Sequence, residues 1–292
     1  MNAHKIVVVG VDGSAEALRA VRWAVPEARR RRATLRLVSA LTWTDDRTVG
    51  WPGLGSAPYG EYLRAAEERG LAAAAAVAAE LDPDLPVERE LIVGFPGGVL
   101  VEQSKTAELL VIGDRGRGRI SSALAGSVAI GVAASAACPV VVVRGAQPSA
   151  DDTRPVVVGV DGSPLSEAAI AFAFEAAAAR PAPMVAVHTW LDELYDPALA
   201  DLVDWQSAAV QAEELLAERL AGWGEKYPDV AVQRLVAHGS AGHALLDQAA
   251  RAQLVVVGTR GHGEIAGLLL DSVSNALVHG AGCPVAIVRA AA

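Results

Sequence analysis

One segment of the sequence occurs twice and limits the fold more than any other feature. Residues 109–113 form a short apolar run, which a glycine-rich stretch (113–119) and the pair Gly126-Ser127 follow. Residues 254–264 repeat the apolar run and the glycine spacing at an offset of 145 positions (258 − 113). Each copy predicts a buried strand, a tight turn and the start of a helix. Because two copies of one strand–turn–helix motif indicate two copies of one domain, the 292-residue chain is predicted to consist of two tandem domains.

The rest of each half predicts strands that alternate with helices. The expected strands of the first half are 5–11, 35–40, 87–93, 109–113 and 140–144, and its helices are 15–32, 61–81, 97–105 and about 121–136. In the second half the expected strands are 155–159, 184–187, 230–237, 254–258 and 285–289, with helices that include 206–226 and 242–251. Such alternation implies right-handed crossovers and a parallel sheet with helices on both faces. The polar segment 145–154 is predicted to link a first domain, 1–145, to a second domain, 155–292.

Composition and charge exclude several classes of function. Hydrophobic residues make up 52% and charged residues 20% of the chain, which argues against disorder. A formal charge of −9 speaks against nucleic-acid and anionic-membrane partners. No apolar run reaches the roughly 18 residues of a membrane-spanning helix, and no secretory pattern opens the chain, so a cytoplasmic protein is expected. Cys138 and Cys283, each before a proline, are predicted to be buried core thiols of a reducing compartment.

The glycine-rich stretches have the chemistry of an anion site. Glycines leave backbone N–H groups uncovered, and a helix N-terminus carries partial positive charge, so phosphate is the first ligand to consider. Asp12 and its repeat Asp161 follow the first strand of each half. Ligands of open parallel sheets bind beyond the carboxyl ends of the strands, where Asp12 and the Gly113 loop are expected to face each other. A carboxylate opposite a phosphate-binding loop suits a nucleotide. Asp12 could then accept hydrogen bonds from ribose hydroxyls or from an adenine amino group, or it could share a Mg²⁺ ion with the phosphates.

These motifs resemble one known family. Gly113, two residues, Gly116, nine residues and Gly126-Ser127 match the G-x2-G-x9-G-[S/T] signature of the ATP-binding branch of the universal stress protein family. The opening Val-Gly-Val-Asp-Gly-Ser and the closing Cys-Pro-Val-Val-Val are also similar to that family. The resemblance covers nearly the whole chain, twice. It implies an α/β fold of two tandem doubly wound five-stranded parallel-sheet domains, adenine nucleotide alpha hydrolase-like, each with strand order 3-2-1-4-5. It further implies that the halves pack as a pseudo-dimer, and a homodimer of chains is left open.

The resemblance also implies the residues that bind ATP, alone or with Mg²⁺. The residues expected at adenine and ribose in the first half are Gly10, Asp12 and Val38. Those expected at ribose and phosphates are Gly113, Asp114, Arg115, Gly116, Arg117, Gly118, Arg119, Gly126, Ser127 and Val128. The corresponding positions of the second half are Gly159, Asp161, Val187, Gly258, Thr259, Arg260, Gly261, His262, Gly263, Ser272 and Val273.

The second half departs from the signature at Asp271, which stands where the first half has Gly126. Glu264 also replaces Arg119, so the second site gains negative charge where a phosphate should approach. In a partly dry crevice such repulsion costs on the order of a few kcal/mol. The first site is therefore predicted to bind nucleotide more tightly than the second.

The sequence favours binding over catalysis. Neither glycine loop contains the lysine of a P-loop, the Rossmann spacing is missed, and no histidine or glutamate recurs at corresponding sites of the two halves. The scattered histidines of the second half do not have metal-ligand spacing, so no metal cluster is expected. The first hypothesis is a nucleotide-dependent regulator of stress response or growth that acts on an unidentified protein partner. Loops 44–60 and 191–205 would order over the nucleotide. The alternatives are a slow ATP hydrolase or phosphotransferase, and a cyclic AMP-binding module on the same fold.

Overall fold

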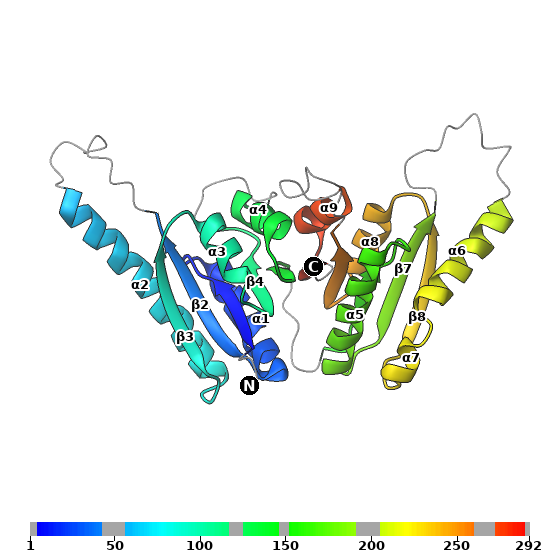
Figure 1. The fold of residues 1–292 in the computed structure, drawn as a ribbon, viewed down its shortest axis with the longest axis horizontal. Helices are drawn as coiled ribbons and strands as arrows, with labels where there is room; N and C mark the ends of the chain where they lie inside the picture. Colours follow the sequence, from blue (N-terminus) through cyan, green and yellow to red (C-terminus); the bar gives the residue numbers. More distant parts are fainter. Residues whose placement is uncertain are drawn as a thin grey trace. The chain divides into compact units, whose positions relative to one another are not determined.

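The chain divides into two compact units, Met1–Val143 and Arg144–Ala292. The computed structural model describes residues 5–42, 56–116, 125–145, 152–190, 205–259 and 272–289. In each unit a parallel sheet lies between helices (Figure 1).

The sheet of the first unit has the order β3-β2-β1-β4-β5, with every neighbouring pair parallel. Its strands are β1 (Ile6–Gly10), β2 (Thr34–Leu41), β3 (Val87–Val93), β4 (Leu109–Gly113) and β5 (Val140–Val143). This confirms the expected order 3-2-1-4-5. The order reverses between β1 and β4, where Val9 pairs with Val111, so the carboxyl ends of these two strands lie side by side.

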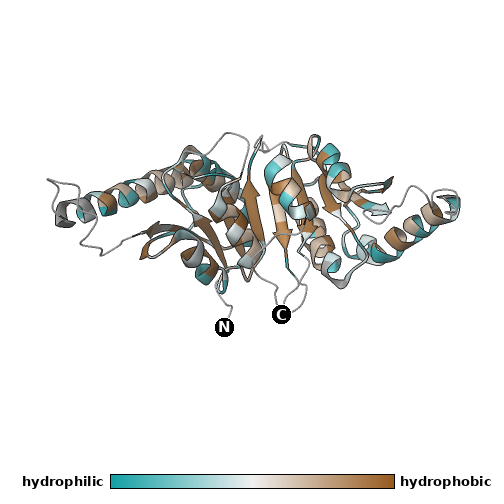
Figure 2. Ribbon diagram, turned by 90° about the horizontal axis from the view of Figure 1, so that it is seen from above, coloured by the Kyte–Doolittle hydropathy of each residue, from teal (hydrophilic) through white to brown (hydrophobic). Residues whose placement is uncertain are grey.

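Two helices cover each face of this sheet. Helix α1 (Ala15–Arg31) packs against α2 (Ser56–Leu81) and β4, and α3 (Pro96–Ser104) packs against α4 (Ser127–Ser135). Because both faces are covered, the central strands are apolar along their length, as the brown strands of Figure 2 show. Val7, Val8, Val9 and the opposing residues of β4 have no exposed surface.

The second unit repeats this order as β8-β7-β6-β9-β10, again all parallel. Its strands are β6 (Val156–Gly159), β7 (Met184–Trp190), β8 (Val232–His238), β9 (Leu254–Gly258) and β10 (Val285–Val288). Its helices are α5 (Pro164–Ala179), α6 (Trp205–Arg219), α7 (Trp223–Lys226), α8 (Ala241–Ala249) and α9 (Ser272–Gly280). The prediction of two doubly wound domains is therefore confirmed unit by unit.

Two helices of the first unit begin elsewhere than predicted. Helix α2 already starts at Ser56, so residues 56–60 are helical and not part of a loop. Pro58 is tolerated because the N–H groups of a first helical turn have no acceptor within the helix. The remainder of that predicted loop, and of the one at 191–205 up to residue 204, lies outside the described residues. Helix α4 begins only at Ser127, because Ala125 and Gly126 are not helical.

The helix predicted over 206–226 is broken into α6 and α7. Gly222 has φ +78, a left-handed conformation that interrupts a helix and that glycine adopts without strain. The break lets Trp223 and Tyr227 stack on the buried ring of Phe174, with ring centroids 5.2 and 5.5 Å away. The packing of these rings thus accompanies the helix break at Gly222, which the helical periodicity of the sequence did not indicate.

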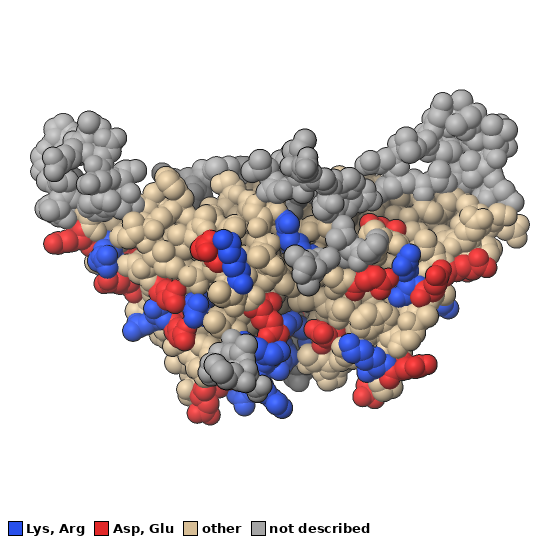
Figure 3. All heavy atoms as spheres, in the orientation of Figure 1, with Lys and Arg blue, Asp and Glu red and all other residues tan. Residues whose placement is uncertain are grey.

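The surface shows no concentration of one sign of charge on the face drawn in Figure 3, where acidic and basic side chains are interspersed. Within the described ranges, no helix is both long and apolar enough to cross a membrane. Cys138 and Cys283 are both free and buried, and desolvation raises the pKa of each thiol to about 12. They are core residues, as predicted.

Candidate functional site

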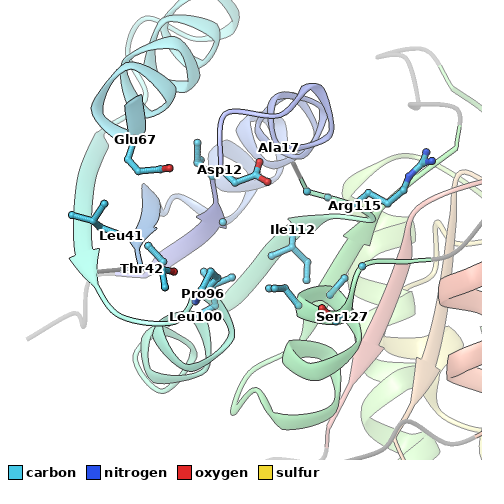
Figure 4. A pocket seen from close by; sticks show the side chains of 18 of the residues that line it. Asp12, Ala17, Leu41, Thr42, Glu67, Pro96, Leu100, Ile112, Arg115 and Ser127 are labelled. Atoms are coloured by element: carbon cyan, nitrogen blue, oxygen red, sulfur yellow. The ribbon is translucent and has the colours of Figure 1, made fainter. Parts of the chain in front are cut away.

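A cavity of about 440 Å³ opens in the first unit beyond the carboxyl ends of β1 and β4. This volume lies in the range of small-molecule sites. The turn after β1, the end of β2, helix α2, the first turns of α3 and α4 and the loop after β4 all line it (Figure 4). The sequence-predicted residues that it brings together are Gly10, Asp12, Gly113, Arg115, Gly116, Gly126, Ser127 and Val128.

Asp12 is held in the turn between β1 and α1. Its carboxylate accepts hydrogen bonds from the Ser14 N–H at 2.9 Å and the Ser14 hydroxyl at 2.5 Å. The same hydroxyl oxygen accepts from the Ala17 N–H at 3.1 Å and so caps α1. Asp12 faces Gly116 closely, since a Cβ on Gly116 would lie 2.5 Å from Asp12 Oδ2. Glycine at 116 therefore makes room for the carboxylate.

Close packing explains why glycine stands at positions 10 and 113. A Cβ on Gly113 would lie 2.9 Å from the carbonyl carbon of Glu16, in the first turn of α1. A Cβ on Gly10 would lie 3.1 Å from Leu100 and from Ile112. The sequence interpretation assigned the glycine loop to phosphate contact, and the structure adds a second reason for Gly113, the close approach of α1 to the end of β4.

The N-terminus of α4 also faces the cavity. Gly126 is its N-cap, with φ −68 and ψ 148, and offers no side chain to cap the helix. The Gly126 N–H donates to the Asp114 carbonyl at 2.8 Å, so this amide closes the loop and is already engaged. The next three residues line the cavity, and the N–H groups of a first helical turn have no acceptor within the helix. Their partial positive charge attracts an anion.

Two predicted residues lie beside the cavity and do not line it. Val38 is 1% exposed, and its carbonyl accepts from the Val11 N–H at 2.8 Å, so it supports the turn that carries Asp12. Asp114 is 5% exposed, with its carboxylate 3.5 Å from Arg19 and 3.4 Å from Arg115 Nε. Arg117, Gly118 and Arg119 lie outside the described residues.

Sequence reasoning missed the end of the cavity away from the glycine loop. It is formed by Ala40, Leu41, Thr42, Leu63, Glu67, Pro96 and Leu100, from β2, α2 and α3. In Figure 4 Leu41, Thr42 and Glu67 lie on one side of Asp12, and Arg115 and Ser127 lie on the other. No sequence motif marks these residues, because they meet only when α2 and α3 pack on opposite faces of the sheet. The cavity thus has an apolar end with one carboxylate and a polar end with helix amides.

The second unit repeats the supporting contacts. A Cβ on Gly159 would approach Leu245 and Val257, at 3.1 and 3.3 Å, as one on Gly10 approaches their counterparts. Asp161 accepts from the N–H and hydroxyl of Ser163, and the Val187 carbonyl accepts from the Val160 N–H. Gly258 ends β9, the Thr259 N–H donates to the Val288 carbonyl, and Ser272 and Val273 begin α9. Arg260, Gly261, His262 and Gly263 lie outside the described residues.

Possible metal ligands do not cluster in the part of the chain that the structure describes. No group of three or more histidine, cysteine, aspartate or glutamate side chains is arranged there to hold a metal ion. Both cysteines are buried away from the cavity lining. Among the described residues that line the first cavity, the charged ones are Asp12, Glu67 and Arg115.

Comparisons with known proteins identify related sequences and a shared fold. A sequence model of the Universal stress protein family matches residues 3–144 and again 153–289. Universal stress protein Rv2005c of Mycobacterium tuberculosis is 41% identical over 294 residues, which cover 97% of this chain and 96% of the relative. A universal stress protein from Archaeoglobus fulgidus has the same fold, with a TM-score of 0.70, 18% identity and coverage of 99% of both chains. A universal stress protein solved in complex with cAMP aligns with 49% of this chain and 99% of its own, at 31% identity and a TM-score of 0.39.

Proposed function

Because the chain belongs to the universal stress protein family, we propose that its first unit binds an adenine nucleotide, with ATP as the principal ligand. Nucleotide occupancy would then regulate a protein partner in stress response or growth. The supporting observation is the arrangement across one cavity of the Asp12 carboxylate and the uncapped N-terminus of α4. A nucleotide carries donor hydroxyls and an anionic phosphate chain, which are complementary to these two groups.

The residues at the polar end fit a phosphate chain. The first-turn N–H groups of α4 supply partial positive charge there, and Gly116 and Gly126 keep the surface free of side chains. Arg115 also lines the cavity, but its guanidinium is directed away from Ser127 in Figure 4 and its Nε lies 3.4 Å from Asp114. Asp12 would accept hydrogen bonds from ribose hydroxyls or ligate a Mg²⁺ ion shared with the phosphates. When bound, the nucleotide would supply the triphosphate charge that neutralises the helix end.

Binding rather than turnover suits the described lining. It contains no histidine, lysine or cysteine, so general-base chemistry would fall to Asp12 or Glu67. Asp12 already accepts two hydrogen bonds from Ser14, which hold its carboxylate in place. We therefore propose nucleotide-dependent regulation as the function, with slow ATP hydrolysis as the second candidate.

The test compares two substitutions of Gly126 in the full chain. Nothing lies closer than 3.7 Å to a Cβ at this position, and its backbone suits any residue, so Gly126→Ala and Gly126→Asp should both fold. Aspartate is moreover a favoured N-cap for α4. Gly126→Asp should weaken the tighter ATP-binding step at least tenfold, about 1.4 kcal/mol or more, because its charge opposes the phosphates.

Isothermal titration with ATP, ADP and cAMP measures the effect, and native mass spectrometry of the purified protein identifies any carried ligand. Gly126→Ala should stay within about threefold of the wild-type affinity, roughly 0.65 kcal/mol. Equal ATP affinity of Gly126→Asp and the wild type, or no binding of any of the three nucleotides at millimolar concentration, would refute the proposal.

A further inference from the structure

We propose that Glu67 reads the base of the nucleotide in the first cavity and selects adenine through its amino group. The inference rests on the proposed function and deepens it, since it assigns the base specificity of that site to one side chain. It starts from the two different ends of the cavity, only one of which is suited to phosphates.

The end that holds Glu67 is suited to a flat apolar ring. Leu41, Leu63, Pro96 and Leu100 supply apolar surface from three different elements. Figure 4 shows the Glu67 side chain directed from α2 toward the space between Asp12 and Leu41, on the side away from Ser127. A nucleotide whose phosphates lie at the α4 N-terminus would extend its base toward this end.

Glu67 is held in place by β2. The hydroxyl of Ser39, which is 1% exposed, donates to Glu67 Oε2 at 2.7 Å. A carboxylate beside apolar side chains needs such donors, because burial without them is costly. Ser39 thus restricts the rotation of the carboxylate and keeps it facing the cavity.

A carboxylate only accepts hydrogen bonds, and this decides which base edge fits. The 6-amino group of adenine donates, so it can bond to Glu67. At the 6-position hypoxanthine carries a carbonyl oxygen in place of that amino group, so a carboxylate facing this position would meet an acceptor, and the N1–H donor of hypoxanthine lies at the neighbouring ring position. A site that places an acceptor against a donor of its ligand disfavours an analogue that presents an oxygen there, because the hydrogen bond is lost and two acceptors face each other.

The second unit does not repeat this pair. His188 follows Val187 in β7, at the register where Ser39 follows Val38 in β2. Its Nδ1 lies 2.7 Å from the Val160 carbonyl, so it is engaged with the turn before Asp161. Helix α6 places Leu215 against Gly162, 3.2 Å from where a Cβ would be. The selection is therefore a property that we assign to the first unit alone.

The experiment measures dissociation constants of the full chain for ATP and for inosine triphosphate, which differ at the 6-position and in the proton that hypoxanthine carries on N1. The wild type should prefer ATP at least tenfold. Glu67→Gln, whose amide can donate to the hypoxanthine oxygen, should reduce this preference at least tenfold. The matched control is Glu68→Gln on the same helix, where the side chain is 57% exposed and 3.8 Å from Arg64. Its preference should equal that of the wild type.

Ser39→Ala provides a second variant that retains the carboxylate and removes its donor, and it should reduce the preference several-fold. A wild-type preference below threefold would overturn the inference without any variant. Equal losses of affinity for both nucleotides in Glu67→Gln would also overturn it, since they would place Glu67 at the ribose. If the wild type binds neither nucleotide, the proposed function fails, which is a different outcome from binding both equally.

Discussion

At the scale of single residues, the glycines of the first site serve different ends. Gly113 admits the backbone of α1, Gly116 admits the Asp12 carboxylate, and a Cβ at Gly126 would make only ordinary van der Waals contacts, the nearest at 3.7 Å. The shared sequence signature therefore contains three glycines that are needed for different physical reasons. Only the last position leaves room for a side chain, and it is the position at which the two halves of the chain differ.

Alanine substitutions should separate these requirements. Gly113→Ala would place a Cβ 2.9 Å from Glu16 backbone, so it should lower the free energy of unfolding by roughly 1–3 kcal/mol. The matched control is Gly131→Ala in α4, where nothing lies within 4 Å of a Cβ. It should raise the free energy of unfolding by about 0.5–1 kcal/mol, because alanine is the better helix former. Urea denaturation measures both, and equal effects would contradict the packing argument.

At the scale of elements, the two copies of the strand–turn–helix opening are not equally capped. In α1 the Ser14 hydroxyl oxygen accepts from the helix N–H of Ala17, while in α5 the Ser163 side chain makes no such bond. Both serines nevertheless donate to the aspartate of their turn. One sequence motif, Asp-Gly-Ser, thus produces the same turn twice and a side-chain cap once.

Removing each hydroxyl should show this difference. Ser14→Ala should destabilise the first turn of α1 by about 1 kcal/mol, whereas Ser163→Ala should cost less than about half of that. Hydrogen exchange localised to the two helix starts is the appropriate measurement, since it reports local opening. Equal acceleration of hydrogen exchange at the starts of both helices would show that the Ser14 cap does not stabilise the first turn of α1.

At the scale of the whole molecule, two units of one fold carry different charges at corresponding sites. In the sequence Asp271 precedes α9 where Gly126 precedes α4, and an aspartate at such a position would compete with a phosphate for the positive end of a helix. If the first unit binds a nucleotide as proposed, we expect its repeat to keep the same fold and to bind the nucleotide more weakly.

Restoring the signature in the second half should restore its affinity. Asp271→Gly, made in a Gly126→Asp background that weakens the first site, should raise the residual ATP affinity about tenfold or more, because it removes a charge opposed to the phosphates. Asp271→Asn is the control that removes the charge and retains the side chain. Titration calorimetry measures all three chains, and an unchanged affinity in Asp271→Gly would mean that Asp271 does not limit the second site.

Much of the fold could be predicted from local patterns. The apolar runs of β1, β4 and their repeats indicated fully buried strands, because a strand covered on both faces needs no polar side. The strand order followed from resemblance to a family and not from periodicity. The early start of α2 and the break at Gly222 escaped prediction, since proline in a first turn and rings stacked on Phe174 act through context.

By itself, the sequence determined the repeat, the alternation of strands and helices, and the Asp12 and glycine-loop elements of the site, because these depend on neighbouring residues. Only the tertiary structure decided what faces them. It brings Glu67 within hydrogen-bonding distance of Ser39, 28 positions earlier, and it engages the Gly126 amide with Asp114. Such pairs form when helices pack on a sheet, and packing joins residues whose separation along the chain carries no signal.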